Sequence, residues 1–219
     1  MKNLFKYLLI VIVTAAIVTG VWFVIKGFNK KNSENVSAAD ANKEIAKALK
    51  DEEWLEEKGL KNDKWAEKQA KESASNEAVG QNQTYNDLYN FYLNIYKTKL
   101  YFTKISDVDG MPAYLVKQHM MDSEHTYLVT YKNGEVVVSK NHAGNDYAAE
   151  TVDIDKNIIE AENVSAGNVT YYKVEGNDIV EIEGFEPDQS DEARKKYKDY
   201  NFVEIDTELT SSNVDKYVK

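Results

Sequence analysis

The feature that most constrains this chain is an uncharged apolar segment close to its N-terminus. Residues 7–25 read YLLIVIVTAAIVTGVWFVI, nineteen residues without a charged side chain. A helix rises about 1.5 Å per residue, so this segment is long enough to cross the hydrocarbon core of a bilayer, which is about 30 Å thick. The sequence therefore predicts a transmembrane signal-anchor within residues 1–31. Lysines flank the segment on both sides, namely Lys2, Lys6, Lys26, Lys30 and Lys31.

Two other interpretations of residues 7–25 remain open, a cleaved signal peptide and a helix buried in a soluble domain. A cleaved signal normally has an apolar core of about 7–15 residues with a small-residue cleavage site soon after it. The only site of that kind, Val36-Ser37-Ala38, lies well beyond Ile25 and beyond three lysines. The length and the spacing therefore favour a segment that is retained and anchors the chain in the membrane.

Composition gives the expected compartment. The chain has no cysteine, so it has no disulfide framework, no thiol chemistry and no N-terminal cysteine that could carry a lipid. All but one of its 27 basic residues are lysine, and asparagine, isoleucine and tyrosine are frequent. This pattern is typical of AT-rich genomes, including those of Gram-positive bacteria. The lysines on the two sides of residues 7–25 are nearly equal in number, so the positive-inside rule discriminates little. We expect a single-pass protein of the cell membrane whose C-terminal domain is extracytoplasmic.

The charge of the chain is distributed unevenly. Residues 1–31 carry +5 and no acidic residue, so the remainder must carry −15 to give the net charge of −10. Proteins bind nucleic acids by neutralising phosphates with lysine and arginine. A strongly acidic soluble part therefore predicts no nucleic-acid partner.

Residues 32–83 are predicted to form a charged helical stalk and a linker. Two stretches, 38–58 and 61–72, are rich in helix-forming residues and only weakly amphipathic, and 73–83 is small and polar. The simplest interpretation is a solvated spacer. Large aromatic residues are unusual in a pure spacer, however, so Trp54 and Trp65 are candidate partner-binding residues.

Residues 84–219 are predicted to form an extracytoplasmic α+β domain. A helix is expected to begin at Thr84, with Asp87 three residues on as a capping signal. Its aromatic residues Tyr85, Tyr89 and Tyr92 recur at helical spacing. Such a stripe is typically core, and the alternative is a binding platform, so these three tyrosines are also candidate partner-binding residues.

From Leu100 the hydrophobic period changes to two, which predicts strands. Asn133-Gly134 is a strong hairpin signal because both positions tolerate positive φ. Strands joined mainly by short turns imply an antiparallel meander. A helix is expected from Ser190 to about Tyr200, then a final strand within 201–209 and a terminal helical turn. The predicted fold class is therefore α+β, with a transmembrane helix, a helical stalk, and a β-meander with flanking helices.

Several short motifs of this domain occur in a recognisable order. They are Asp107-Val108-Asp109-Gly110, Met111-Pro112, the Tyr-Lys-Asn-Gly of 131–134, the Tyr-Tyr-Lys-Val of 171–174, and the Leu-Thr-Ser-Ser-Asn-Val of 209–214. In this order they resemble largely uncharacterised extracytoplasmic domains of Gram-positive bacteria, often lipoproteins, that carry an Asp-x-Asp-Gly-Asp-Gly-x-Pro-Glu-Leu signature. The resemblance covers residues 84–219 and implies a domain outside the membrane.

The same resemblance implies that Asp107 and Asp109 are calcium ligands. Two departures count against a metal: the second Asp-Gly pair is absent, and Ala113-Tyr114 replaces Glu-Leu. Calcium takes six to eight oxygen ligands, and two aspartates supply few of them. We therefore expect a tight turn here and no cofactor, with a calcium site as the alternative.

The sequence contains no phosphate-binding glycine loop, no nucleophile elbow and no zinc-protease motif. We expect a non-catalytic binding or scaffolding protein of the cell envelope, with the membrane contacted through residues 7–25 and a protein partner outside it, as an accessory subunit of a membrane complex. The alternative from another class is a calcium-dependent or glycan-active envelope enzyme. A third is an immunity or sensor protein that contacts its partner through the small-residue face Thr14–Gly20.

Overall fold

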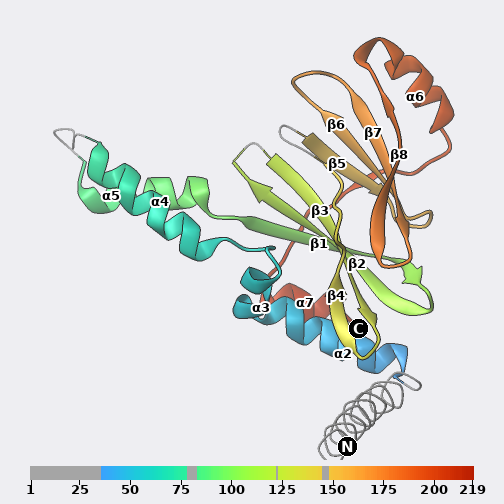
Figure 1. The fold of residues 1–219 in the computed structure, drawn as a ribbon, viewed down its shortest axis with the longest axis horizontal. Helices are drawn as coiled ribbons and strands as arrows, with labels where there is room; N and C mark the ends of the chain where they lie inside the picture. Colours follow the sequence, from blue (N-terminus) through green and yellow to red (C-terminus); the bar gives the residue numbers. More distant parts are fainter. Residues whose placement is uncertain (1–35, 78–82, 122, 145–147) are drawn as a thin grey trace, which may run out of the picture.

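The computed structural model describes residues 36–77, 83–121, 123–144 and 148–219. The predicted membrane segment, residues 7–25, lies outside this part of the chain. Within the described residues, no helix is both long enough and apolar enough to span a bilayer. Figure 1 shows the arrangement of the elements.

In the described chain a block of helices is followed by a block of strands and then by a short C-terminal part with both. The helices are α2 (Ala38–Lys50), α3 (Glu52–Glu57), α4 (Asp63–Asn76), α5 (Tyr85–Tyr96), the short 3-10 helix η1 (Pro187–Gln189), α6 (Ser190–Lys196) and α7 (Ser211–Tyr217). The strands are β1 (Lys99–Val108), β2 (Met111–Met120), β3 (Ser123–Lys132), β4 (Glu135–Val138), β5 (Ala148–Asp153), β6 (Ile158–Asn163), β7 (Val169–Glu175), β8 (Asp178–Phe185), β9 (Val203–Glu204) and β10 (Thr207–Glu208).

These strands form two antiparallel sheets, which confirms the predicted α+β class. Sheet A has the strand order β10-β1-β2-β3-β4, and sheet B has the order β8-β7-β6-β5-β9. We expected one meander. The structure instead has two, because the connection from β4 to β5 leaves sheet A and starts a second sheet.

The hairpin turns follow the residues that favour positive φ. In the β3–β4 turn, Asn133 and Gly134 have φ of 54° and 93°, between the paired residues Lys132 and Glu135. In the β1–β2 turn, Asp109 and Gly110 have φ of 52° and 75°. Both are two-residue turns of the kind that matches the twist of a hairpin. The Asp-x-Asp-Gly motif therefore covers the end of β1, at Asp107-Val108, and the two-residue turn Asp109-Gly110 that leads to β2.

Three hydrophobic clusters hold the layers together. The first lies between sheet A and the helices α2, α3 and α7; it includes Phe102 and Tyr114. The second fills the space between the two sheets; it includes Leu115 and Ile159. The third lies on the far side of sheet B against α6; it includes Tyr171. Alternate residues of β2 enter the first and second clusters, so sheet A is covered on both faces.

Helix α2 belongs to this core and is not part of a stalk, contrary to our expectation for residues 38–58. Ile45 is 0% exposed and Leu49 is 2% exposed, and both pack against sheet A. Buried Asn42 accepts a hydrogen bond of 2.8 Å from the hydroxyl of Tyr114 on β2. The sequence signal was weak because three of the five buried residues are alanine or asparagine, which carry at most a weak hydrophobic signal. Within the described chain, the segment that stands away from the sheets begins only at α4.

This difference predicts unequal effects of two substitutions in α2. Ile45→Ala should lower the free energy of unfolding by about 2–4 kcal/mol, because it removes buried methyl groups and leaves a cavity. Lys47→Ala, on the exposed face of the same helix, should change it by less than about 0.5 kcal/mol. Urea denaturation of the full chain in detergent measures both. Equal, small effects of the two substitutions would mean that α2 is a solvated spacer and does not pack against sheet A.

The last strand predicted within 201–209 is divided between the two sheets. β9 pairs with β5 at one edge of sheet B, and β10 pairs with β1 at one edge of sheet A. Between them Ile205 is 1% exposed and lies in the cluster between the sheets. One short segment, residues 203–208, therefore supplies an edge strand to each of the two sheets.

Candidate functional site

A helical hairpin projects from the β-sandwich (Figure 1). We call α4 and α5, residues 63–76 and 85–96, the arm. On its inner side α4 presents Ala66, Ala70 and Ala74, which are 0–2% exposed. On α5 the buried residue is Leu88. Small side chains at every fourth position let two helices approach closely, so the arm is held together by its own contacts and leaves its outer faces open.

Asn62 fixes the base of the arm. Its side-chain nitrogen donates to the carbonyl oxygen of Tyr96 at 3.1 Å, and its side-chain oxygen accepts from the backbone N–H of Thr98 at 3.0 Å. The same residue precedes α4 as its N-cap. One amide therefore joins the start of α4 to the end of α5, at the point where β1 leaves the arm for sheet A.

Four of the five predicted partner-binding residues lie on the arm. Trp65 and Tyr85 are exposed, at 45% and 44%, and Tyr89 and Tyr92 are half-buried. Tyr85 and Tyr89 stack with ring centroids 6.4 Å apart, and the hydroxyl of Tyr92 donates to Glu77. The most exposed aromatic residue here is Phe91, at 59%, which the sequence analysis did not select. Phe91 is three residues from the buried Leu88 and so lies near it on the helix, and helical spacing alone does not show that it is exposed.

The fifth predicted residue, Trp54, lies apart from the others. It is on α3 and packs, half-buried, against the cluster between α2 and sheet A. The structure therefore brings Trp65 together with the tyrosines and does not bring Trp54 to them.

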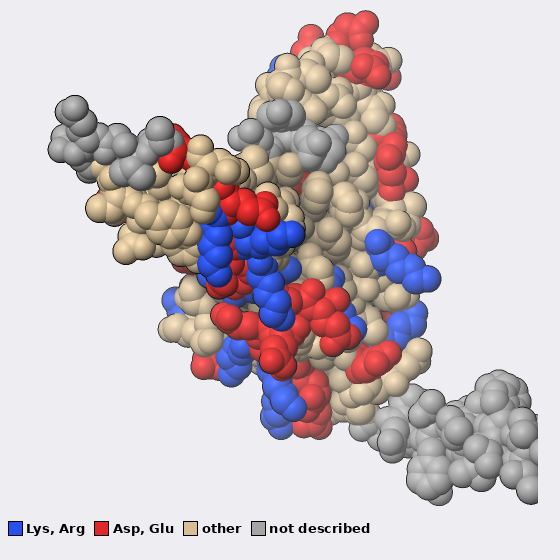
Figure 2. All heavy atoms as spheres, turned by 60° about the vertical axis from the view of Figure 1, so that its left-hand side comes forward, with Lys and Arg blue, Asp and Glu red and all other residues tan. Residues whose placement is uncertain are grey.

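The two helices of the arm differ in charge. The outer side of α4 carries exposed ion pairs, Lys68 with Glu72 at 3.9 Å and Glu67 with Lys71 at 4.0 Å. By contrast, α5 has one charged residue in twelve, Asp87. That carboxylate accepts from the backbone N–H and the hydroxyl of Thr84 in a capping box, which the sequence predicted, and these bonds lower its pKa. Figure 2 turns the arm toward the viewer; its outer part is largely uncharged, and charged side chains gather nearer the body.

The predicted metal ligands Asp107 and Asp109 lie at the β1–β2 turn. Burial, together with the Asp107 charge, raises the pKa of the nearby Tyr114 to about 12. In the part of the chain that the structure describes, no three or more histidine, cysteine or acidic residues gather in a way that could hold a metal ion. The two aspartates are thus placed on a hairpin turn without a third acidic residue beside them.

A buried polar cluster lies where the two sheets meet, and its central residue is Glu150 of β5. The side chain of Glu150 accepts a hydrogen bond from the hydroxyl of Thr126, and its other oxygen, Oε1, is buried without a partner. Glu124 accepts from the backbone N–H of Glu150 at 3.2 Å. The ammonium of Lys117 and Nδ1 of His119 lie 3.3 and 3.2 Å from the Glu124 carboxylate.

Burial dominates the chemistry of Glu150, which is 2% exposed. Loss of hydration raises its pKa, the Thr126 hydrogen bond lowers it, the Glu124 charge raises it and Lys117 lowers it; the result is about 8. Glu150 is therefore largely protonated at neutral pH. Sequence reasoning missed this residue, although its position between Ala148 and Val152, on the inward side of a strand, was a usable signal.

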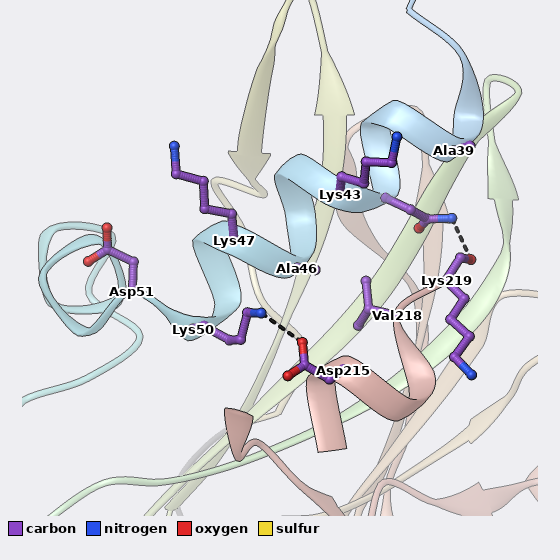
Figure 3. Close-up of a pocket in the computed structure, with 10 residues that line it drawn as sticks. Ala39, Lys43, Ala46, Lys47, Lys50, Asp51, Asp215, Val218 and Lys219 are labelled. Atoms are coloured by element: carbon purple, nitrogen blue, oxygen red, sulfur yellow. Dashed lines mark hydrogen bonds and ion pairs between the residues drawn. The ribbon is translucent and has the colours of Figure 1, made fainter. Parts of the chain in front are cut away.

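A surface groove of about 600 Å³ runs between α2 and α7 (Figure 3). The ammonium of Lys50 pairs with Asp215 across it at 2.7 Å, and Asn42 donates to the backbone oxygen of Lys219 at 2.6 Å. These contacts tie the last helix to α2. Two of the lysines that line the groove, Lys43 and Lys50, are paired with carboxylates, and in the described chain Lys47 and Lys219 form no ion pair.

Comparison with known protein families, with curated proteins and with solved structures finds no match to this chain.

Proposed function

We propose that this chain is a non-catalytic binding protein of a bacterial cell envelope, anchored in the membrane by residues 7–25, which presents its arm to a protein partner outside the cytoplasm. The observation that carries the proposal is the arm itself. It stands clear of the sandwich and exposes large aromatic side chains, whereas the aromatic side chains of the described strands are buried or half-buried. Exposed aromatic residues gathered on one element are typical of interaction surfaces.

The form of the arm supports a binding role. Its inner contacts and the Asn62 bonds hold it rigid before a partner arrives, so little conformational entropy is lost on association. Tyrosine and tryptophan supply large contact areas with few rotatable bonds. A preformed projection of this kind suits a protein that scaffolds or completes a membrane complex.

The remaining support comes from the sequence. An apolar segment of nineteen residues precedes a strongly acidic domain without cysteine, as expected of an anchored bacterial envelope protein. The order of motifs in residues 84–219 resembles extracytoplasmic domains of Gram-positive bacteria. Both features favour the same location for the arm.

Photocrosslinking in intact cells tests the proposal. A photoreactive phenylalanine analogue at position 91 of the full chain should give a discrete protein adduct after illumination. The same analogue at Val180, which is 42% exposed on β8, is the matched control and should give none. The adduct at position 91 should disappear when Trp65 and Tyr85 are both replaced by serine. Equal labelling at positions 91 and 180, or none at either, would contradict docking through the arm.

A further inference from the structure

The contact between the two sheets is apolar where Leu115 and Leu128 lie and becomes polar at one end. Two residues away along β2 and β3, on the same face of sheet A, the paired positions are Lys117 and Thr126. The side chain of Glu150 on β5 reaches Thr126 from sheet B. In the described chain, three of the buried residues nearby are alanines, namely Ala143, Ala148 and Ala161. Little apolar surface therefore holds the sheets together here, and local separation costs less at this end than in the apolar part.

Glu150 occupies this place with one hydrogen bond to its side chain. The hydroxyl of Thr126 donates to Oε2, and among the described residues Oε1 is buried without a partner. Gly144 lies so close to Oε1 that a Cβ atom on it would overlap that oxygen. A buried carboxylate is costly unless several donors or a cation compensate its charge. The site therefore suits a neutral carboxyl and penalises an ionised one.

The charged groups around Glu150 compensate a negative charge on it only in part. On β3, the carboxylate of Glu124 accepts from the backbone N–H of Glu150 at 3.2 Å and repels a second carboxylate. On β2, Lys117 and His119 lie 3.3 and 3.2 Å from Glu124, which engages both. Two phenols also face this region, Tyr127 of β3 and Tyr172 of β7, and burial raises the pKa of both.

Moving the start of β5 away from β3 breaks no strand pairing, because the two strands belong to different sheets. Residues 148–150 pair with β6, whereas β9 meets β5 only at Thr151 and Val152. Val152 also lies in the apolar cluster between the sheets. The first half of β5 is thus joined to sheet A mainly through polar contacts, and the second half through apolar ones.

We propose that Glu150 is a pH-sensitive switch at this end of the sandwich. With its carboxyl protonated, the start of β5 stays against β3; with the carboxyl ionised, the start of β5 moves away and water reaches the carboxylate. The apolar cluster keeps the rest of the two sheets together. The closed form holds the proton more tightly than the open form, so opening becomes up to about tenfold more favourable per pH unit as pH rises from about 5 to about 8. This inference concerns the sandwich and does not depend on docking through the arm.

Alkylation of a single cysteine tests the switch, because the chain has no thiol of its own. Ala148 is 7% exposed and lies on the same side of β5 as Glu150, so Ala148→Cys reports on the start of this strand. In the full chain in detergent, its reaction rate with iodoacetamide should rise at least tenfold more between pH 6 and pH 8.5 than the rate of the same cysteine combined with Glu150→Gln. The thiolate fraction rises with pH in both chains and cancels in the ratio. An equal rise in the two chains would overturn the proposal.

A second cysteine separates local opening from unfolding of the whole chain. Ala41 is 0% exposed in the cluster between sheet A and the helices, so Ala41→Cys is the matched control. At pH 8.5 the thiol at position 148 should react at least tenfold faster than the thiol at position 41. Equal rates at the two positions would mean that the whole chain unfolds, and they would overturn a local switch.

Glu124→Gln is the second variant, for use where circular dichroism shows that Glu150→Gln does not fold. It removes the charge that repels an ionised Glu150, so the closed form tolerates ionisation better. The rise in alkylation at position 148 between pH 6 and pH 8.5 should therefore become at least twofold smaller. A rise of unchanged size in this variant would also contradict the switch.

Discussion

Glu150→Gln is expected to flatten the dependence of stability on pH. The pKa of Glu150 is raised by burial from about 4.5 in the unfolded chain to about 8 in the folded one. Between these values the folded state keeps a proton that the unfolded state has lost, so stability is complete below the unfolded pKa and is lost as pH rises toward 8. Each pH unit in this window costs about 1.4 kcal/mol at most, and the total loss from pH 5 to pH 8 is on the order of 3 kcal/mol. Glutamine has a similar shape and does not titrate.

Urea denaturation of the full chain in detergent, at several pH values from 5 to 8, measures this effect. The difference in slope between the wild-type chain and the Glu150→Gln variant isolates the contribution of Glu150 from that of all other groups. Glu162→Gln on β6 is the matched control. Glu162 is exposed, so its substitution should not change the slope of the unfolding free energy against pH. Parallel curves for the wild-type chain and the Glu150→Gln variant would mean that Glu150 is ionised in the folded protein at neutral pH.

Gly144→Ala is expected to destabilise the fold by about 3–5 kcal/mol, through a backbone penalty and a steric one. Gly144 has φ of +85°, a left-handed conformation that alanine adopts at a cost. A Cβ atom here would overlap both Oε1 of Glu150 and the backbone oxygen of Glu124. The side chain of Glu150 is buried, and the backbone oxygen of Glu124 belongs to strand β3. Neither group can therefore move away easily from the added Cβ atom.

Gly110→Ala is the matched control for Gly144→Ala. Gly110 has a similar φ of +75°, but nothing lies within 4 Å of a Cβ atom at that position. Its substitution should therefore cost only the backbone penalty, about 1–2 kcal/mol. The difference between the two variants in chemical denaturation measures the steric term. If both variants lose the same stability, the close approach of Gly144 to Glu150 and Glu124 is not present in solution.

The sequence predicts those parts of the fold that depend on local chemistry. Asn133-Gly134 forms the expected hairpin turn because both residues accept positive φ. Thr84 and Asp87 form the expected capping box at the start of α5. The change to a period of two after Leu100 locates the strands, because alternation follows from the pleat of a strand.

Features that depend on tertiary packing were not predictable in the same way. The burial of α2 depends on Ala41 and Asn42, whose side chains carry no strong apolar signal, and Asn42 is inside because Tyr114 offers it a hydrogen bond. Ile205 lies between two short strands because the chain must leave sheet B and reach sheet A there. Glu150 looks like a surface residue in sequence, since carboxylates are rarely buried.

The candidate site was predictable only in part. Helical spacing predicted that Tyr85, Tyr89 and Tyr92 share one side of α5, but the exposure of Phe91, three residues from buried Leu88, depends on tertiary packing. The pairing of Trp65 with Tyr96, with ring centroids 5.8 Å apart, needs the antiparallel arrangement of α4 and α5. That arrangement follows from the Asn62 hydrogen bonds and from three alanines, which local patterns did not reveal.

Labelling of a single cysteine on intact cells tests the central claim most directly, which is that an anchored domain presents its arm outside the cytoplasm. Lys195 is exposed on α6 and has no described hydrogen bond or ion pair, so Lys195→Cys is a suitable probe in a chain without other cysteines. Lys2→Cys is the reference for the opposite side of the membrane. We expect a membrane-impermeant maleimide to label position 195 on intact cells and position 2 only after permeabilisation, with all of the protein in the membrane fraction. Labelling of position 195 only after permeabilisation, or recovery of the domain free in the medium, would contradict the account.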